Sequence, residues 1–178
     1  MTNYMGEHLV RARFLADLMK YQERLPSHSL CLAGGAVRDT LLNRLVKNRD
    51  YFTDCAMTTA QAGRVFGVSM HRVKLPRGLN YRGDDKQSSV RWVLTSEDQA
   101  IKCMCLLCEP CNQIVQFPDA LSMCWLTSDG EIQYDGEFRQ AINSKTVPYT
   151  TRMSEERLAR IKDKYADYEF VATGREFL

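Results

Sequence analysis

The sequence lacks the features of a membrane protein and of a secreted protein. Its 178 residues contain no apolar run approaching the roughly 20 residues that a membrane helix needs. The first residues, MTNYMGEHLVRARF, show no apolar signal core and no small-residue cleavage site. We therefore expect a cytoplasmic protein with no membrane partner.

The chain also has little excess of either charge and few histidines. The 24 basic and 22 acidic residues give a net charge of +2, and they are mixed along the chain. This balance permits a nucleotide or nucleic-acid partner but does not indicate one. The three histidines, His8, His28 and His71, are scattered and have no matching cysteine or aspartate frame. A catalytic histidine dyad is therefore not indicated.

The seven cysteines occur in a chain without secretory features, so a disulfide framework is not expected. Four of them, Cys103, Cys105, Cys108 and Cys111, lie close together. Thiolates so grouped bind zinc or iron–sulfur clusters in other proteins. The first three lie in the apolar run IKCMCLLC, however, and the spacing fits no common zinc motif. Small buried thiols are the interpretation that the pattern favours.

The polar and apolar pattern predicts one α/β (α+β) domain over 1-178. Its core would span about 29-145, and a C-terminal helical tail would span about 150-178. Thr58 or Thr59 is placed to cap one helix, and Ser154 is placed to cap another. Helices are expected over 7–23, 36–45, 60–66, 111–117 and 154–165, and strands over 29–33, 50–53, 90–95, 101–108, 121–127 and 131–134.

Residues 76–88, PRGLNYRGDDKQS, are rich in turn formers and charge, and they predict a loop. Its cations, Arg77, Arg82 and Lys86, would suit a phosphate backbone. A solvated loop is the simpler interpretation, because isolated charges rarely specify a ligand.

The most informative segment is LAGGAVRDTLLNRLVKNRDYF, residues 32–52. A strand ends there in Gly34 and Gly35, and a helix begins at once. Such a junction turns backbone amides toward an anion, because no side chain obstructs the approach. Arg38 and Asp39 fall in the first turn of that helix, close to any bound group.

The same segment resembles the head-domain signature of nucleotidyltransferases of the DNA polymerase β superfamily, in the branch of CCA-adding enzymes and bacterial poly(A) polymerases. That signature has Gly-Gly, one residue, Val-Arg-Asp, a Leu-Leu-Gly-Arg-like helix, and Lys-Asp-x-Asp opening a strand. The chain matches it without a gap, with Gly34-Gly35-Ala36-Val37-Arg38-Asp39, then Leu41-Leu42-Asn43-Arg44, then Lys47-Asn48-Arg49-Asp50. The resemblance implies a nucleotidyltransferase fold, in which helices flank a small mixed β-sheet.

Two later segments are similar to short members of that superfamily, many of them carried by tailed phages. These segments are residues 117–134 and the run KTVPYTTRMSEERLARIKDKYADYEF. For a phage-encoded chain, the location would be the host cytoplasm. Active CCA-adding enzymes carry a large helical body that grips tRNA, and 178 residues leave no room for one. Addition of CCA to tRNA is therefore not expected.

The resemblance also implies the site residues. Gly34 and Gly35, with Arg38 and Asp39, would bind the nucleoside triphosphate (NTP), and Asp50 with Asn48 would form the catalytic, magnesium-binding pair. Two Mg²⁺ ions in such enzymes stabilise the attacking and leaving oxygens of an in-line displacement.

The chain departs from that pattern at two carboxylates. The first position of the Asp-x-Asp pair is Asn48, whose amide oxygen is neutral. The expected third carboxylate is missing from strand 101–108, which contains Lys102 but no acid. Asp54 and Asp119 are nearby in sequence, but no pattern places either of them at the site.

Two functions therefore remain open. In the first, the chain binds an NTP and, if it is active, transfers the nucleoside monophosphate to an RNA, protein or small-molecule acceptor. Alternatively, it is a catalytically inactive relative that acts as a binding or inhibitory protein on a host protein or nucleic acid.

Overall fold

The fold is described from a computed structural model, which covers residues 4–74 and 89–174. The predicted loop over 76–88, with Arg77, Arg82 and Lys86, lies outside the described residues. No helix within the described ranges is long and apolar enough to span a membrane.

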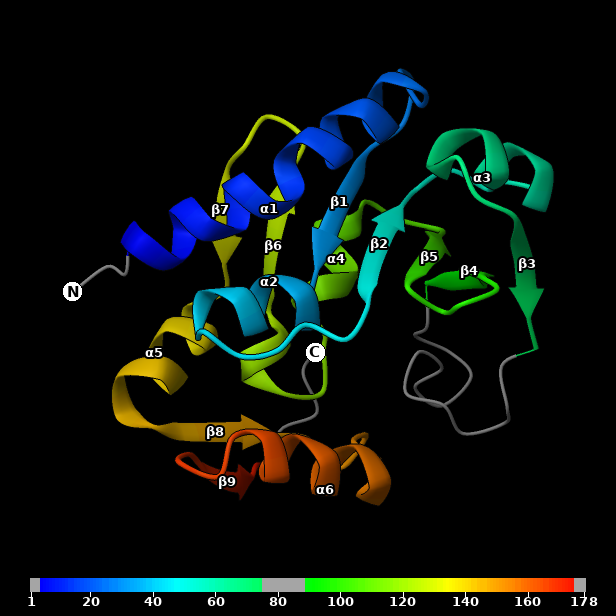
Figure 1. The fold of residues 1–178 in the computed structure, drawn as a ribbon. Helices are drawn as coiled ribbons and strands as arrows, with labels where there is room; N and C mark the ends of the chain where they lie inside the picture. The colour runs from blue at the N-terminus through cyan, green and yellow to red at the C-terminus, as the bar shows by residue number, and fades with distance from the viewer. Residues whose placement is uncertain (1–3, 75–88, 175–178) are drawn as a thin grey trace.

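A seven-stranded mixed sheet forms the centre of the fold (Figure 1). Its strand order is β3-β4-β5-β2-β1-β6-β7. Strand β2 pairs antiparallel with β1 and parallel with β5. The strands are β1 (Leu30–Ala33), β2 (Arg49–Thr53), β3 (Met70–Val73), β4 (Val90–Ser96), β5 (Ile101–Leu106), β6 (Cys124–Thr127) and β7 (Ile132–Tyr134).

Helices cover both faces of this sheet. The helices are α1 (Tyr4–Glu23), α2 (Gly35–Leu41), α3 (Thr59–Phe66), α4 (Pro110–Ile114), the 3-10 turn η1 (Ala120–Ser122), α5 (Gly136–Ser144) and α6 (Glu155–Lys164). Because side chains alternate along a strand, neighbouring residues of β2 face opposite layers. Tyr51 packs against Tyr21 of α1 and Phe66 of α3, with ring centroids 5.5 and 5.2 Å away. Phe52 packs at 5.5 Å against Phe117, which follows α4. Asp50 therefore shares the face of Phe52.

The C-terminal region has a small core of its own. Strand β8 (Thr146–Tyr149) pairs in parallel with β9 (Glu169–Ala172), outside the main sheet. The side chains packed there come from η1, α5, β8, α6 and the residues around them: Ala120, Leu121, Ala141, Val147, Met153, Ile161, Tyr165 and Tyr168. The predicted tail helix is thus present as α6, and a strand follows it.

The local signals in the sequence account for most of these elements. Val10, Phe14 and Leu18 of α1 are fully buried, as their helical spacing predicted. Thr58 caps α3 through a capping box with Gln61. Ser154 caps α6 by accepting a hydrogen bond from the Arg157 amide at 3.3 Å.

Other boundaries differ from the prediction. The helix expected over 36–45 ends at Leu41, because Asn43 adopts a left-handed conformation (φ 54°) that terminates a helix. The helix expected over 111–117 is α4, which starts one residue earlier, with Pro110 in its first turn, and ends at Ile114. The strand expected over 121–127 begins at Cys124, after the turn η1. Five elements were not predicted, namely β3, η1, α5, β8 and β9.

The cysteines of β5 lie on the face opposite to Lys102. Cys103 and Cys105 are fully buried, Cys108 is half-buried and Cys111 is exposed. Within the described ranges, no group of three or more histidine, cysteine or acidic side chains is placed to hold a metal ion. The four thiols therefore do not converge on one centre.

Candidate functional site

The glycine turn lies beside Asp50 at one end of the sheet. Ala33, the last residue of β1, is the register partner of Asp50 on β2, so Gly34 follows directly beyond that pair. Gly34 has φ +65° and ψ −126°, a backbone conformation that disfavours any side chain. Its amide donates to the Cys124 carbonyl of β6 at 3.0 Å. The turn is thereby fixed against the sheet, and this amide already has a partner.

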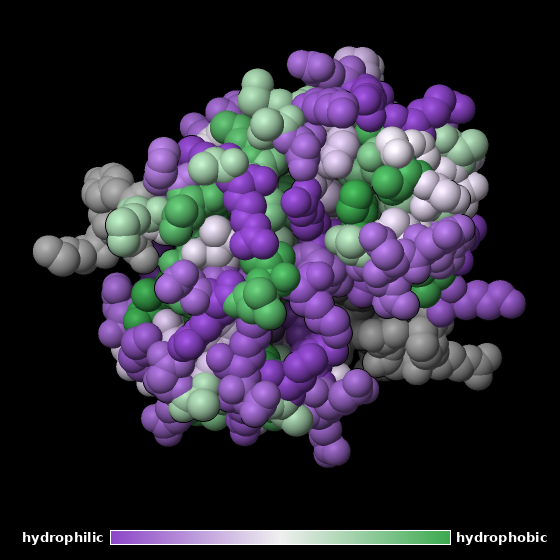
Figure 2. Space-filling model, viewed as in Figure 1, coloured by the Kyte–Doolittle hydropathy of each residue, from purple (hydrophilic) through white to green (hydrophobic). Residues whose placement is uncertain are grey.

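A cavity of about 620 Å³ opens between this end of the sheet and α6. Hydrophilic side chains gather over this region in the space-filling view (Figure 2). The wall contains Gly34, Gly35, Asn48 and two aromatic rings. Its charged side chains are six basic residues, Arg38, Lys47, Lys102, Arg157, Arg160 and Lys164, and four acidic ones, Asp39, Asp50, Asp98 and Asp163. The excess of positive charge favours an anionic ligand.

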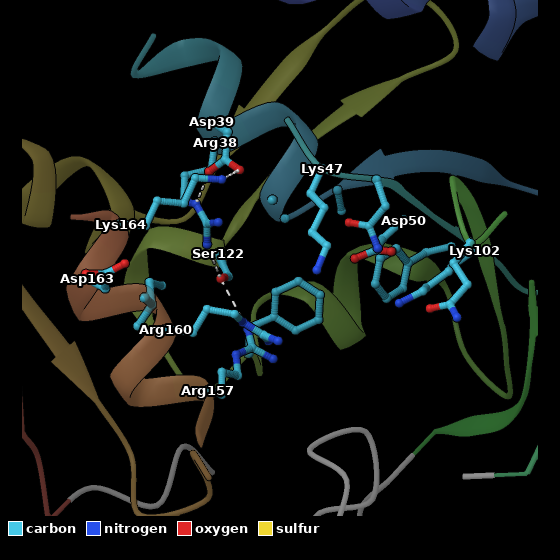
Figure 3. Close-up of a pocket in the computed structure, with 18 of the residues that line it drawn as sticks. Arg38, Asp39, Lys47, Asp50, Lys102, Ser122, Arg157, Arg160, Asp163 and Lys164 are labelled. Carbon is cyan, nitrogen blue, oxygen red and sulfur yellow. Dashed lines mark hydrogen bonds and ion pairs between the residues drawn. The ribbon is translucent and has the colours of Figure 1, made fainter. Parts of the chain in front are cut away.

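The basic residues come from both sides of the cavity. Lys47 and Lys102 belong to the sheet side, whereas Arg157 and Arg160 extend from α6 (Figure 3). None of the ion pairs among the described residues includes Lys47, Lys102 or Arg160. Three cations are therefore available to a ligand that enters the cavity.

Asp50 faces this cavity with one unsatisfied oxygen. The residue is half-buried, and its Oδ1 atom is buried without a hydrogen-bond partner among the described residues. Burial raises the pKa of Asp50, and the cations of Lys102 and Arg157 oppose that rise without cancelling it. A buried carboxylate oxygen without a partner destabilises a fold, so packing alone does not account for an acid at this position.

Arg38 and Asp39 line the same cavity but bind mainly each other and α6. Arg38 Nε donates to Asp39 Oδ1 at 2.7 Å, and the Tyr165 hydroxyl donates to the same oxygen at 2.5 Å. Lys164 Nζ contacts the other oxygen, Asp39 Oδ2. Burial by itself would lower the pKa of Arg38, but Tyr165 and Asp39 raise it on balance. These contacts fix α6 against α2 and so set the width of the cavity.

A second buried acid positions Arg157. Asp119 is fully buried and accepts hydrogen bonds from Ser122 Oγ at 2.8 Å and from Arg157 Nη2 at 3.0 Å. Ser122 also accepts a hydrogen bond from Arg38 Nη1 at 3.3 Å. Arg157 is thereby held at the cavity edge by residues outside its own helix.

The residues of this site do not fit a two-metal centre. Of the predicted pair, Asp50 presents a carboxylate and Asn48 a neutral amide. Asp54 and Asp119, the nearby acids in the sequence, do not line the cavity. Asp98 does, but its Oδ1 accepts from Ser96 Oγ at 2.6 Å and from the Ala100 amide at 3.0 Å, within its own turn. Magnesium prefers several anionic oxygens, which this wall does not supply together.

The structure thus brings all the predicted site residues, Gly34, Gly35, Arg38, Asp39, Asn48 and Asp50, to one cavity. It adds five basic residues that had no predicted role at the site: Lys47, Lys102, Arg157, Arg160 and Lys164. For Arg157 and Arg160, the only local signal was their spacing of three residues, which places two basic side chains on one face of a helix.

No protein-family model matches the chain, and no curated protein sequence matches it. Several solved structures, however, match the fold of the chain. The chain is similar to the CCA-adding enzyme of Bacillus stearothermophilus in complex with CTP, with a TM-score of 0.53 and 13% identity over 91% of this chain and 41% of that one. A tRNA-processing enzyme in an apo form gives a TM-score of 0.59 and 11% identity over 90% and 44%. The CCA-adding enzyme of Thermotoga maritima complexed with tRNA gives a TM-score of 0.52 and 13% identity over 75% and 31%.

These likenesses show that the chain has the nucleotidyltransferase fold of CCA-adding enzymes. The chain spans less than half the length of these enzymes.

Proposed function

We propose that this chain binds a nucleoside triphosphate in the cavity between the glycine turn and α6. The observation that carries the proposal is one cavity of about 620 Å³ in which a glycine turn, Asp50 and six basic side chains meet. That volume lies in the range of small-ligand sites. The solved structure with bound CTP has the same fold, which supports a nucleotide as the ligand.

The parts of the cavity suit different parts of such a ligand. Lys47, Lys102 and Arg160 have no ion pair of their own among the described residues, so they supply the charge that a polyphosphate needs. Gly34 lets the phosphates approach the backbone closely. The unsatisfied Oδ1 of Asp50 accepts a hydrogen bond from a hydroxyl of the ligand.

The test is calorimetric titration of the full chain with ATP, CTP, GTP and UTP. A nucleotide at a hundred times its dissociation constant should also add about 2.7 kcal/mol to the free energy of unfolding. Lys47→Ala should weaken binding, because it removes a cation that lines the cavity. Lys20→Ala is the matched control, since Lys20 is exposed in the last turn of α1 and does not line the cavity. Absence of binding by all four nucleotides would refute the proposal.

Asp50 also favours a second candidate, nucleotidyl transfer. In that reaction an acceptor hydroxyl oxygen bonds to the α-phosphorus, the bond from that phosphorus to the bridging oxygen breaks, and pyrophosphate leaves. The buried, unpaired Oδ1 of Asp50 would take the hydroxyl proton. The acceptor would be an RNA, a protein or a small molecule.

Transfer is tested with radiolabelled ATP, Mg²⁺ or Mn²⁺, and candidate acceptors of each class. Label transfer that Asp50→Ala abolishes would establish the activity. Nucleotide binding without transfer in any of these assays would identify a binding protein on a nucleotidyltransferase scaffold.

A further inference from the structure

The neighbour of Asp50 on the adjoining strand is a cation. In the parallel pair of β2 and β5, Asp50 is in register with Lys102. Side chains in register on parallel strands project from the same face of the sheet. Lys102 is also the strongest of the charges that act on Asp50. Figure 3 shows the two side chains together on the sheet side of the cavity.

Three further cations act on the same carboxylate. Arg38, Arg157 and Arg160 reach Asp50 electrostatically from α2 and α6. Asn48, the other predicted metal ligand, is neutral and lines the same cavity. A divalent ion beside Asp50 would thus have one carboxylate to bind and several positive charges to repel it.

We propose that the cavity binds the nucleoside triphosphate free of divalent metal, with the Lys102 ammonium taking the place of a metal ion at the phosphates. This inference rests on the proposed nucleotide binding and adds the form in which the nucleotide is recognised. Lysine is a compact charge that contacts phosphate oxygens directly.

A consequence is that magnesium opposes binding. Mg²⁺ coordinates the phosphate oxygens and neutralises part of their charge. The free nucleotide is therefore the more strongly attracted ligand at a wall with six basic side chains and four acidic ones. A site built on metal-bridging carboxylates has the opposite preference, because there the metal links protein to phosphate.

The first test measures the dissociation constant of ATP for the full chain in excess EDTA and in excess MgCl2. We expect ATP to bind in EDTA, and magnesium to weaken that binding by about tenfold. Binding that requires MgCl2 would overturn the metal-free inference and leave the proposed nucleotide binding standing. No binding under either condition would overturn the proposed function itself.

The second test removes the charge at Lys102. Lys102→Ala should weaken ATP binding in EDTA by about tenfold, since it removes a charge-assisted contact to phosphate. Lys20→Ala, the control outside the cavity, should change nothing. An unchanged affinity in a folded Lys102→Ala protein contradicts the role given to Lys102.

The third test rebuilds the carboxylates that the chain lacks. The double variant Asn48→Asp with Lys102→Asp places two new acids beside Asp50. Electron paramagnetic resonance of Mn²⁺ titrated into each protein reports metal binding without nucleotide or activity. We expect the double variant to bind Mn²⁺ at least about tenfold more tightly than the unaltered chain. Equal and tight Mn²⁺ binding by the unaltered chain would contradict the inference.

Discussion

Two carboxylates line the same cavity from opposite sides of the glycine turn, and their surroundings differ completely. Asp39, on α2, is buried and bound by Arg38, Tyr165 and Lys164. Asp50, on β2, has a buried oxygen without a partner among the described residues. A buried acid with partners holds elements together, whereas a buried oxygen without one costs free energy and calls for an explanation other than packing. Asp39 therefore joins α2 to α6, whereas Asp50 leaves an acceptor open at the β2–β5 edge of the cavity.

The largest effect should come from Asp39→Ala. The substitution leaves Arg38, which is nine-tenths buried, without its carboxylate partner. Removing one member of a buried ion pair costs about 3–5 kcal/mol. Urea unfolding followed by circular dichroism measures the loss. Asp163→Ala is the control, because Asp163 lines the same cavity but is exposed, and it should change stability by less than about 0.5 kcal/mol. Equal effects of the two variants would contradict the structural role of Asp39.

Tyr165→Phe should have an intermediate effect. It keeps the buried ring but removes the hydroxyl that donates to Asp39 Oδ1 at 2.5 Å. The expected loss is about 1.5–3 kcal/mol, the range for a hydrogen bond to a charged group. Thermal unfolding detects it. Tyr149→Phe, at a half-buried ring outside this network, should be close to neutral. A neutral Tyr165→Phe would show that the junction does not depend on this hydrogen bond.

Asp50→Asn should act in the opposite direction and stabilise the protein. Burial raises the pKa of Asp50 in the folded state, so folding at neutral pH works against the charged carboxylate that the unfolded chain carries. The asparagine has no such charge, and we expect the melting temperature at neutral pH to rise by about 2–4 °C. The gain should shrink as pH falls through the raised folded-state pKa, and it should vanish below the unfolded-state pKa, where the wild-type carboxyl is neutral in both states. A lower melting temperature at neutral pH would contradict this account.

Arg160→Ala should have the smallest effect on stability. Arg160 is exposed on α6 and forms no ion pair among the described residues, so the change should stay within about 0.5 kcal/mol. The affinity of the Arg160→Ala protein for ATP should nevertheless fall by about tenfold, because Arg160 lines the cavity. Calorimetry and thermal unfolding of the same variant separate the two effects. A destabilised variant with unchanged affinity would contradict the ligand-binding role given to Arg160.

Local signals in the sequence predicted much of the fold. The buried stripe of α1, the Thr58 and Ser154 caps and the hairpin of β6 with β7 were all expected. Strands β8 and β9 were not, because each is short and their parallel pairing joins segments that are far apart in the chain. Helix α5 was missed as well, although Asp135 caps it by accepting from the Glu137 amide at 2.9 Å.

The candidate site likewise has one part that the local sequence predicted and another that depends on tertiary packing. The sequence by itself determined a glycine turn and an acid at position 50 close to it, because both belong to one segment of 32–52 and to adjoining strands. Only the tertiary structure decided which charges face that acid. The register of β2 against β5 places Lys102 beside Asp50, and α6 brings Arg157 and Arg160 to the same cavity from more than a hundred residues away. Strand register and helix docking depend on how whole layers pack, and no local pattern of residues specifies that packing.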